Sequence, residues 1–83
     1  MTKRICTAPD IDLKATGRRI KQLRQDHNYT VLEVSIYAGV SQAAVYSWEN
    51  GTNLPDLSNL LGLQFLYKLK SLNDLLVLTK PMC

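Results

Sequence analysis

The amino-acid sequence predicts an all-α domain of five short helices. No segment of useful length alternates apolar and polar residues with the two-residue period of a strand. The turn pairs that are typical of β-hairpins are missing apart from Asn50-Gly51, which follows a helical pattern. The chain has 83 residues, of which 46% are apolar and 20% are charged, so its length and composition fit one small packed domain.

The first helix is expected over residues 17–27, with Thr16 as its N-cap. Ile20 and Leu23 lie about one turn apart and form an apolar edge on one face of this helix, while basic residues occupy much of the remainder. The residues before it, 1–15, show no comparable pattern, and we expect them to form an N-terminal arm.

The second helix is expected over residues 31–38, directly after the cap residue Thr30. Glu33 stands at the third helical position, from which its side chain can complete a capping box with Thr30. Gly39 follows at once, and a helix that ends abruptly favours a residue that adopts positive φ without steric cost. The turn to the next helix is therefore expected to be short.

Three more helices are predicted by similar signals. Ser41 is expected to cap the third helix over residues 42–50, which ends before Gly51. The fourth helix is expected over 57–67, and Ser71 is expected to cap the fifth. The predicted organisation is an N-terminal arm over 1–15, a helical domain over 16–78 and a C-terminal tail over 79–83.

The basic residues are concentrated towards the two ends of the sequence. The formal net charge is +3, and none of the 10 Lys and Arg residues lies between residues 25 and 67. That middle stretch contains four acidic residues and is therefore negative. A positive surplus mildly favours polyanionic partners. The basic residues near the N-terminus are Lys3, Arg4, Lys14, Arg18, Arg19, Lys21 and Arg24.

The residues that usually carry catalysis or bind metals are few and scattered. Cys6 and Cys83 lie near opposite ends, a spacing that matches no metal site and no disulfide framework. His27 has no cysteine, serine or second histidine within a few positions. The sequence near it therefore lacks the residues needed for a zinc site or for a nucleophile–base pair. We expect no enzyme, no cofactor and no small-molecule substrate. No apolar run reaches the roughly 18 residues that span a bilayer, which predicts a cytoplasmic protein.

Two short helices joined by a tight glycine turn are typical of the helix-turn-helix arrangement. Over about residues 16–78 the sequence resembles the lambda-repressor-like DNA-binding domains (Cro/CI-type, XRE-type). The resemblance implies that the second and third helices form the motif, and several positions at fixed separations carry it. They are Gly17, Ile20, Leu23, Arg24, Thr30, Val34, Ala38-Gly39-Val40-Ser41, Val45, Trp48-Glu49-Asn50-Gly51, Pro55 and Leu60.

The resemblance also implies an ion pair between Arg24 and Glu49, which ties the first helix to the end of the third. A bidentate contact between a guanidinium and a carboxylate is chemically suited to this position. Its role is structural, because leaving either charge partly buried and unpaired costs about 3–5 kcal/mol. Arg24 is therefore not counted among the cations that could bind DNA.

By the same resemblance, the third helix faces DNA with Gln42, Ala43, Tyr46 and Ser47. The planar amide of Gln42 offers one donor and one acceptor, which match N6 and N7 of adenine. The alternative for Gln42 is an exposed residue at the start of a helix. Ala43 can contact a thymine methyl group, although helix propensity explains it equally well. Tyr46 either enters the groove or covers the core.

Contacts to the DNA backbone are expected from helix N-termini and from neutral side chains. These side chains are Thr30, Ser41, Asn50, Thr52 and Asn53. Because the motif contains no lysine or arginine, few counterions are released on binding and the electrostatic contribution is small. Binding is then either weak and dependent on a dimer, or assisted by Arg18 and Arg19 on the first helix and by Lys3 and Arg4 as a minor-groove arm. The alternative for the charges on the first helix is a solvated face.

The chain also carries more large apolar residues than so small a domain is expected to bury. Leu32 and Ile36 form a stripe on the second helix, where the resembling family usually has polar side chains. The last two helices are apolar on every side, so we expect a homodimer formed through the fifth helix, to which the end of the fourth helix can add. Its interface would contain Leu72, Leu75, Leu76 and Leu78. The alternative is that these leucines fill the core of the monomer.

Together the sequence and the resemblance predict a sequence-specific DNA-binding transcriptional regulator, a small repressor. It would bind a palindromic operator in double-stranded DNA as a dimer, with the third helix of each copy in the major groove and the two helices about 34 Å apart. The alternative is a protein-interaction module that keeps the scaffold without binding DNA. The cation-free middle stretch favours this alternative.

Overall fold

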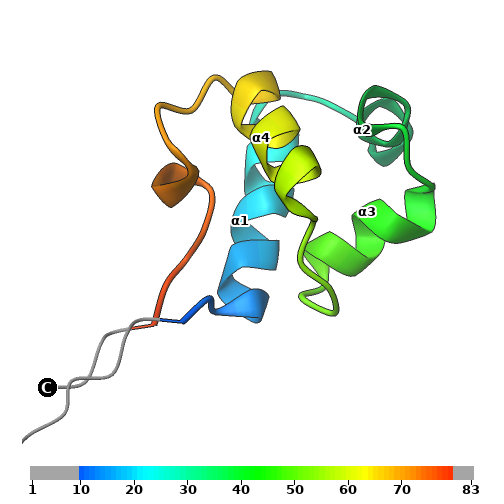
Figure 1. The fold of residues 1–83 in the computed structure, drawn as a ribbon. Coiled ribbons are helices and arrows are strands. Elements are labelled where there is room, and N and C mark those ends of the chain that lie inside the picture. Colours follow the sequence, from blue (N-terminus) through cyan, green and yellow to red (C-terminus); the bar gives the residue numbers. More distant parts are fainter. Residues whose placement is uncertain (1–9, 80–83) are drawn as a thin grey trace, which may run out of the picture.

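The computed structural model of the chain describes residues 10–79 and shows an all-helical fold (Figure 1). It contains α1 (Leu13–Asp26), α2 (Val31–Ala38), α3 (Gln42–Glu49) and α4 (Leu57–Leu66), followed by a short 3-10 helix, η1 (Leu72–Asp74). No strand occurs in this range, so the predicted all-α class is confirmed. None of these helices combines the length and the apolar character that crossing a bilayer demands.

The sequence predicts the bounds of α2 correctly and those of α3 to within one residue. Oγ1 of Thr30 accepts a hydrogen bond from the backbone N–H of Glu33 (3.1 Å), and the Glu33 carboxylate accepts one from the Thr30 N–H (2.9 Å). Gly39 ends α2 with a φ of 70°. Oγ of Ser41 accepts from the backbone N–H of Ala44 (3.1 Å) and so caps α3. These local hydrogen bonds explain why both helices begin where the sequence indicates.

The first helix begins earlier than predicted, and Thr16 is not its cap. Asp12 caps α1, because its carboxylate accepts a hydrogen bond from the backbone N–H of Ala15 (3.0 Å). Thr16 lies inside α1 and is buried. Its hydroxyl oxygen accepts from the N–H of Val77 (2.9 Å) and donates to the carbonyl of Val77 (3.3 Å). The threonine that resembles a cap therefore anchors the C-terminal segment.

The predicted fifth α-helix is wrong, because the chain after Ser71 forms only the short helix η1. The side chain of Ser71 makes no capping hydrogen bond. Beyond η1, the Val77 carbonyl accepts from the N–H of Asp12 (2.8 Å), and the Thr79 N–H donates to the backbone carbonyl of Asp10 (2.7 Å). The backbone groups of residues 77–79 thus find partners beside the start of α1, where a continued helix would have paired them internally.

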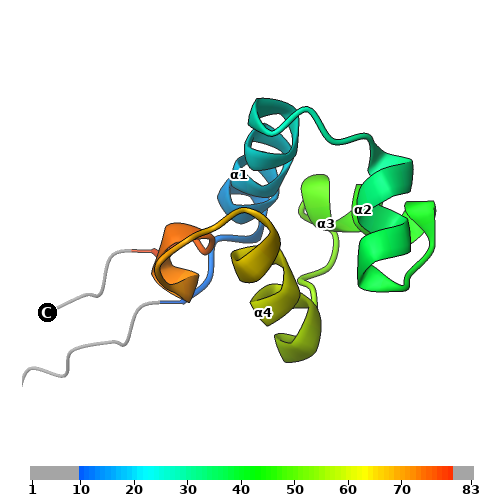
Figure 2. The same cartoon turned by 90° about the horizontal axis from the view of Figure 1, so that it is seen from above.

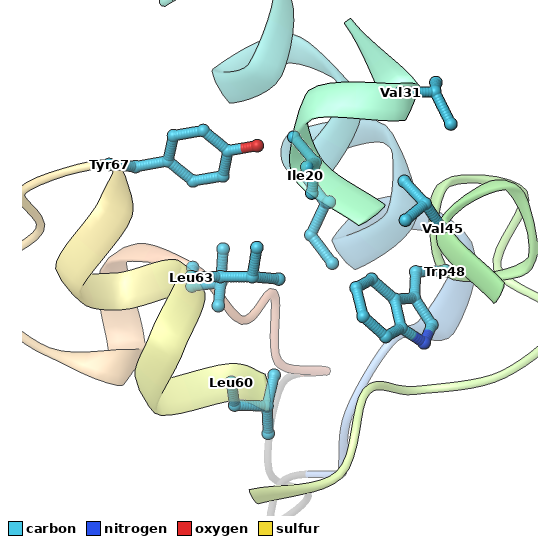
Figure 3. Packing of buried hydrophobic residues seen from close by; sticks show 9 residues of the cluster. Ile20, Val31, Val45, Trp48, Leu60, Leu63 and Tyr67 are labelled. Carbon is cyan, nitrogen blue, oxygen red and sulfur yellow. The ribbon is translucent and has the colours of Figure 1, made fainter. Parts of the chain in front are cut away.

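One apolar cluster lies between the helices (Figure 3). All four α-helices contribute to it, as does the segment after α4. Its buried members are Ile20 from α1, Val31 and Val34 from α2, Val45 and Trp48 from α3, Leu60 and Leu63 from α4, and then Tyr67 and Leu75. Val45 and Trp48 thus pack α3 into a cluster that it shares with the other three helices.

The end of α3 packs against α1, and the two helices lie beside each other in Figures 1 and 2. A Cβ atom added at Gly17 would lie 2.6 Å from the carbonyl oxygens of both Trp48 and Glu49. These are backbone atoms at the last turn of α3, and no side-chain rotation can relieve such a contact. Gly17 is therefore required by close packing.

We expect Gly17→Ala to lower the free energy of unfolding by about 1–3 kcal/mol, the usual range for overpacking a close contact. Urea denaturation followed by circular dichroism measures this change. Gly62→Ala in α4 is the matched control, because a Cβ there would lie 3.7 Å from the ring of Tyr37, an ordinary contact. The control should gain about 0.5–1 kcal/mol from helix propensity. Equal effects of the two substitutions would contradict the close approach of α1 to α3.

Candidate nucleic-acid interface

The two faces of α3 differ in burial and in chemistry. Val45 and Trp48 face the core, and the helical period of 3.6 residues then turns the predicted DNA-facing residues outwards. Gln42, Ala43 and Tyr46 are exposed, and Ser47 is half-buried. The predicted base-contacting residues therefore share one accessible surface, with the glutamine in the first turn of the helix.

A hollow of about 420 Å³ lies beside this surface. Gln42 and Tyr46 line it from α3, Thr30 and Leu32 line it from the start of α2, and Lys21 lines it from α1. Three helices thus meet around one opening that combines an amide, two hydroxyl groups, an alkyl side chain and an ammonium group. Such a mixture suits a partner that presents both polar edges and apolar groups.

The neutral residues expected to contact the DNA backbone all lie on the surface, at Thr30, Ser41, Asn50, Thr52 and Asn53. The structure brings Thr30 and Asn50 together around the hollow, whereas the other three lie outside it. Thr30 and Ser41 use a hydroxyl oxygen as acceptor within their own helices. Their hydroxyl hydrogens are donors that a phosphate oxygen could accept.

The basic residues of α1 point to different sides of the helix. Nη1 of Arg19 donates to the carbonyl of Asp74 (3.4 Å) in η1, which lies across α1 from α3 in Figures 1 and 2. Nζ of Lys14 donates instead to the carbonyl of Asn50 at the end of α3 (3.1 Å). Lys21 lines the hollow. Arg18 lies between Lys14 and Lys21 along α1, and its side chain is exposed.

The basic stripe of α1, defined as Lys14, Arg18 and Lys21, is a site feature that the sequence reasoning missed. The spacing of four and then three residues places the three side chains along one helical face, a signal that was present in the sequence. The position of Arg19 gives no support to its predicted contact with the DNA backbone. Lys3 and Arg4, the predicted minor-groove arm, lie outside the described residues, as do Cys6 and Cys83.

Arg24 and Glu49 form a bidentate ion pair between α1 and α3. Nε of Arg24 lies 2.7 Å from one carboxylate oxygen of Glu49, and Nη2 lies 3.1 Å from the other. Nη1 donates to the carbonyl of Tyr29 (3.0 Å), so every arm of the guanidinium has a partner. The hydrogen bonds to Glu49 raise the pKa of Arg24 above its ordinary value. The pair lines the hollow but is fully committed to holding the helices together.

Tyr67, the residue that follows α4, is buried with a hydroxyl group that has no hydrogen-bond partner among residues 10–79. Its ring lies 5.1 Å from that of His27 and 6.3 Å from that of Tyr29, measured between centroids. Burial raises the pKa of Tyr67, and the negative charge of Glu49 adds to the effect. The native state therefore favours the neutral phenol.

The predicted dimer interface is not a free surface in this structure. Leu75 is completely buried in the chain's own core, and Leu72 and Leu76 pack against that core. Leu78 is 44% exposed, but it lies in the bridge opposite Ile11. The alternative reading, in which these leucines fill the monomer core, agrees with the burial of the first three. The physical reason is that the chain turns back over α4 and α1 after η1.

Residues 10–79 contain no group of three or more His, Cys, Asp or Glu residues that could hold a metal ion. The exposed apolar side chains of this range lie mainly on α2 and α4. They include Leu32, Ile36, Leu57, Leu61 and Phe65.

A family model for helix-turn-helix proteins matches residues 20–64, a range that contains α2, α3 and most of α4. Among solved structures with a similar fold is the restriction-modification controller protein C.AhdI from Aeromonas hydrophila. It has a TM-score of 0.69 and 23% sequence identity, covering 77% of this chain and 96% of that one. Another is SinR, the master regulator for biofilm formation, in complex with DNA. It has a TM-score of 0.63 and 28% identity, covering 72% of this chain and 95% of that one. No curated protein sequence matches significantly.

The raised pKa of Tyr67 predicts a loss of stability at alkaline pH. An unfolded tyrosine ionises near pH 10, whereas native Tyr67 stays neutral, so stability is intact below about pH 10 and falls above it by up to 1.4 kcal/mol per pH unit. Tyr67→Phe should reduce this loss, and it should stabilise the neutral-pH protein by about 1 kcal/mol because it removes a buried unpaired hydroxyl. Urea unfolding between pH 8 and about pH 11 checks both effects.

Tyr37→Phe is the matched control for this experiment. The Tyr37 hydroxyl is accessible and donates to the Gly62 carbonyl (2.9 Å), so its removal should cost stability at neutral pH and leave the alkaline loss in place. An unchanged alkaline loss in Tyr67→Phe would show that another group causes it.

Proposed function

The chain belongs to the XRE-type helix-turn-helix family, and from this membership we propose that it is a transcriptional repressor that recognises a specific DNA sequence through α3. In this proposal α2 and α3 form the helix-turn-helix motif, and α3 enters the major groove. The observation that carries the proposal is the outer surface of α3, where Gln42, Ala43 and Tyr46 are exposed together.

The chemistry of this surface supports base recognition. Gln42 lies at the first turn of α3 and beside the hollow, so its amide has room to form two hydrogen bonds with an adenine edge. Ala43 has no bulk that would hold the helix away from the base pairs. Tyr46 is 51% exposed, which leaves its ring free to contact a base or a phosphate. SinR, with which this chain shares the fold, was solved in complex with DNA.

Phosphate contacts would come from two sources. Thr30 and Asn50 supply neutral hydrogen-bonding groups at the edge of the hollow, and Ser41, Thr52 and Asn53 supply more around the ends of α3. The basic stripe of α1 supplies the positive charge that α2 and α3 lack. Lys21 is its most direct member, because it shares the hollow with Gln42. Charge supplied from α1 would release counterions without a cation in the motif itself.

A homodimer completes the proposal. One copy offers few cations to DNA, so its affinity for a single half-site would be low. Two copies related by a two-fold axis would bind a palindromic operator, with their α3 helices about 34 Å apart. The binding free energies of the two half-sites would then add. Occupying a promoter in this way is sufficient for repression.

Selection of bound sites from a random DNA library tests the function. We expect a palindromic site, and we expect Gln42→Ala to bind it more weakly by about 1–3 kcal/mol, with relaxed preference at one adenine. Gln22→Ala is the matched control, because Gln22 lies on α1 with its amide donating to Asp26 (2.8 Å). A selected site that Gln42→Ala and the control bind alike would contradict the base contact.

The salt dependence of binding tests the basic stripe. Lys21→Ala should reduce the slope of log K against log salt by about 0.9, the loss of one phosphate contact. Arg19→Ala removes the same charge from the same helix on the side that faces η1, and it should leave the slope nearly unchanged. Equal slopes in the two variants would mean that the charges of α1 form only a solvated face.

A second candidate is the protein-interaction module, which the exposure of Leu32 (50%) and Ile36 (72%) favours. These apolar side chains on α2 would be covered by a protein partner. The absence of any selected DNA site at low salt would support this candidate over the repressor.

A further inference from the structure

The outer face of α4 carries an apolar stripe that no other part of the described chain covers. Leu57, Leu61 and Phe65 follow one another at intervals of four residues, so they lie along one side of the helix. Their exposed fractions are 65%, 50% and 81%, and Phe65 is the most exposed large apolar residue within 10–79. The opposite side of α4 buries Leu60 and Leu63. None of the three residues of this α4 stripe belongs to the core cluster of its own chain.

A hollow of about 530 Å³ lies next to the α4 stripe. Leu61 and Phe65 belong to its lining together with Gln64, Lys68 and Leu69. The amide of Gln64 donates to the Leu69 carbonyl (3.4 Å) and so is occupied within the chain. The same face thus presents a protruding aromatic ring and an apolar hollow beside it. A two-fold interface uses the same patch of both copies, and a patch with a projection next to a hollow can be complementary to itself.

The charges at the ends of α4 also fit a second copy in antiparallel orientation. Asp56 is exposed at the start of α4, and Lys68 is exposed just after its end. If two stripes pack antiparallel, Leu61 meets Leu61 near the axis and Leu57 meets Phe65. Asp56 of one copy then approaches Lys68 of the other at both ends. This pairing of opposite charges favours a second copy as the occupant of the stripe.

The α4 stripe is separate from the surface proposed for DNA. The hollow beside Phe65 and the hollow beside Gln42 share no lining residue. Tyr37 links α2 to α4, because its hydroxyl donates to the Gly62 carbonyl (2.9 Å). A copy bound at α4 would leave α3 accessible and would hold it at a fixed orientation.

From these observations we propose that the α4 stripe is the self-association surface of this protein, where a second copy packs antiparallel with its Leu57 against Phe65 at the hollow. This inference rests on the homodimer in the proposed function and replaces the predicted fifth-helix interface. The face is small and its charged rim is limited, so the dimer is expected to form at micromolar concentrations.

Sedimentation equilibrium of the full chain tests the surface. We expect the wild type to dimerise and Phe65→Glu to weaken self-association at least tenfold, because a carboxylate would enter an apolar contact. Ile36→Glu is the matched control, since it places the same charge on a similarly exposed apolar residue of α2. Circular dichroism reports whether each variant is folded, and Phe65→Ser replaces Phe65→Glu if the latter is not. A wild-type monomer, or a dimer that Ile36→Glu disrupts and Phe65→Glu does not, would overturn the proposal.

Cross-linking tests the antiparallel arrangement. In a background with Cys6→Ser and Cys83→Ser, Leu61→Cys should form an intermolecular disulfide under mild oxidation, because Leu61 lies near the axis. Ile36→Cys should not. Cross-linking of Ile36→Cys alone would contradict the proposed face.

Binding to a selected DNA site separates this inference from the proposed function. Phe65→Glu should keep the affinity of the wild type for a half-site and lose the extra affinity for the full palindrome. A wild type that is dimeric and sensitive to Phe65→Glu but selects no DNA supports the surface and refutes the repressor. A wild type that binds a full site equally well with and without Phe65→Glu supports DNA binding and refutes the surface.

Discussion

The close approach of α1 to the last turn of α3 is the contact on which the rest of the structure depends. Gly17 lets the backbone of α1 approach the carbonyl groups of Trp48 and Glu49, and two turns further along α1 the guanidinium of Arg24 holds the Glu49 carboxylate. Both contacts act on the same turn of α3. They fix which side of this eight-residue helix faces the core, and so they also fix which side faces a ligand. Without them α3 is too short to keep its orientation through local hydrogen bonds alone.

This arrangement has an electrostatic consequence. Residues 10–79 contain equal numbers of basic and acidic residues, and the net charge of +3 arises from Lys3, Arg4 and Lys80. Attraction of the folded part to a polyanion therefore depends on how its charges are placed, not on their sum. Arg24 is neutralised by Glu49, and Arg19 points to η1. Lys21 is then the basic residue that shares the hollow with Gln42 and is not engaged in an ion pair there.

Local sequence signals predicted α2 and α3 well, and they failed where distant segments decide the structure. Three local features involve only neighbours within a few residues, so the sequence predicts them. They are the capping box of Thr30, the positive φ of Gly39 and the cap at Ser41. Thr16 resembles a cap in the same way, but its hydroxyl binds Val77, 61 residues away. The same long-range pairing replaces the predicted fifth helix. Helical spacing in the sequence indicates which residues of α1 share a side. The partner of Arg19 cannot be predicted in this way, because it depends on where the chain after Ser71 packs.

The surplus of leucines in the C-terminal third has two structural explanations, and they are connected. Leu72, Leu75 and Leu76 return to the core because the chain after η1 pairs with the residues before α1. That return covers α1 and the inner side of α4 and leaves the outer side of α4 without a covering segment. The leucines expected at an interface thus complete the core of the domain. The apolar surface that remains lies on the outer side of α4. The inner residues of α4, Leu60 and Leu63, share a cluster with Val45 and Trp48 of α3. In the proposed dimer, a contact at α4 would therefore position α3 through packed side chains, and the domain core would set the spacing of the two α3 helices.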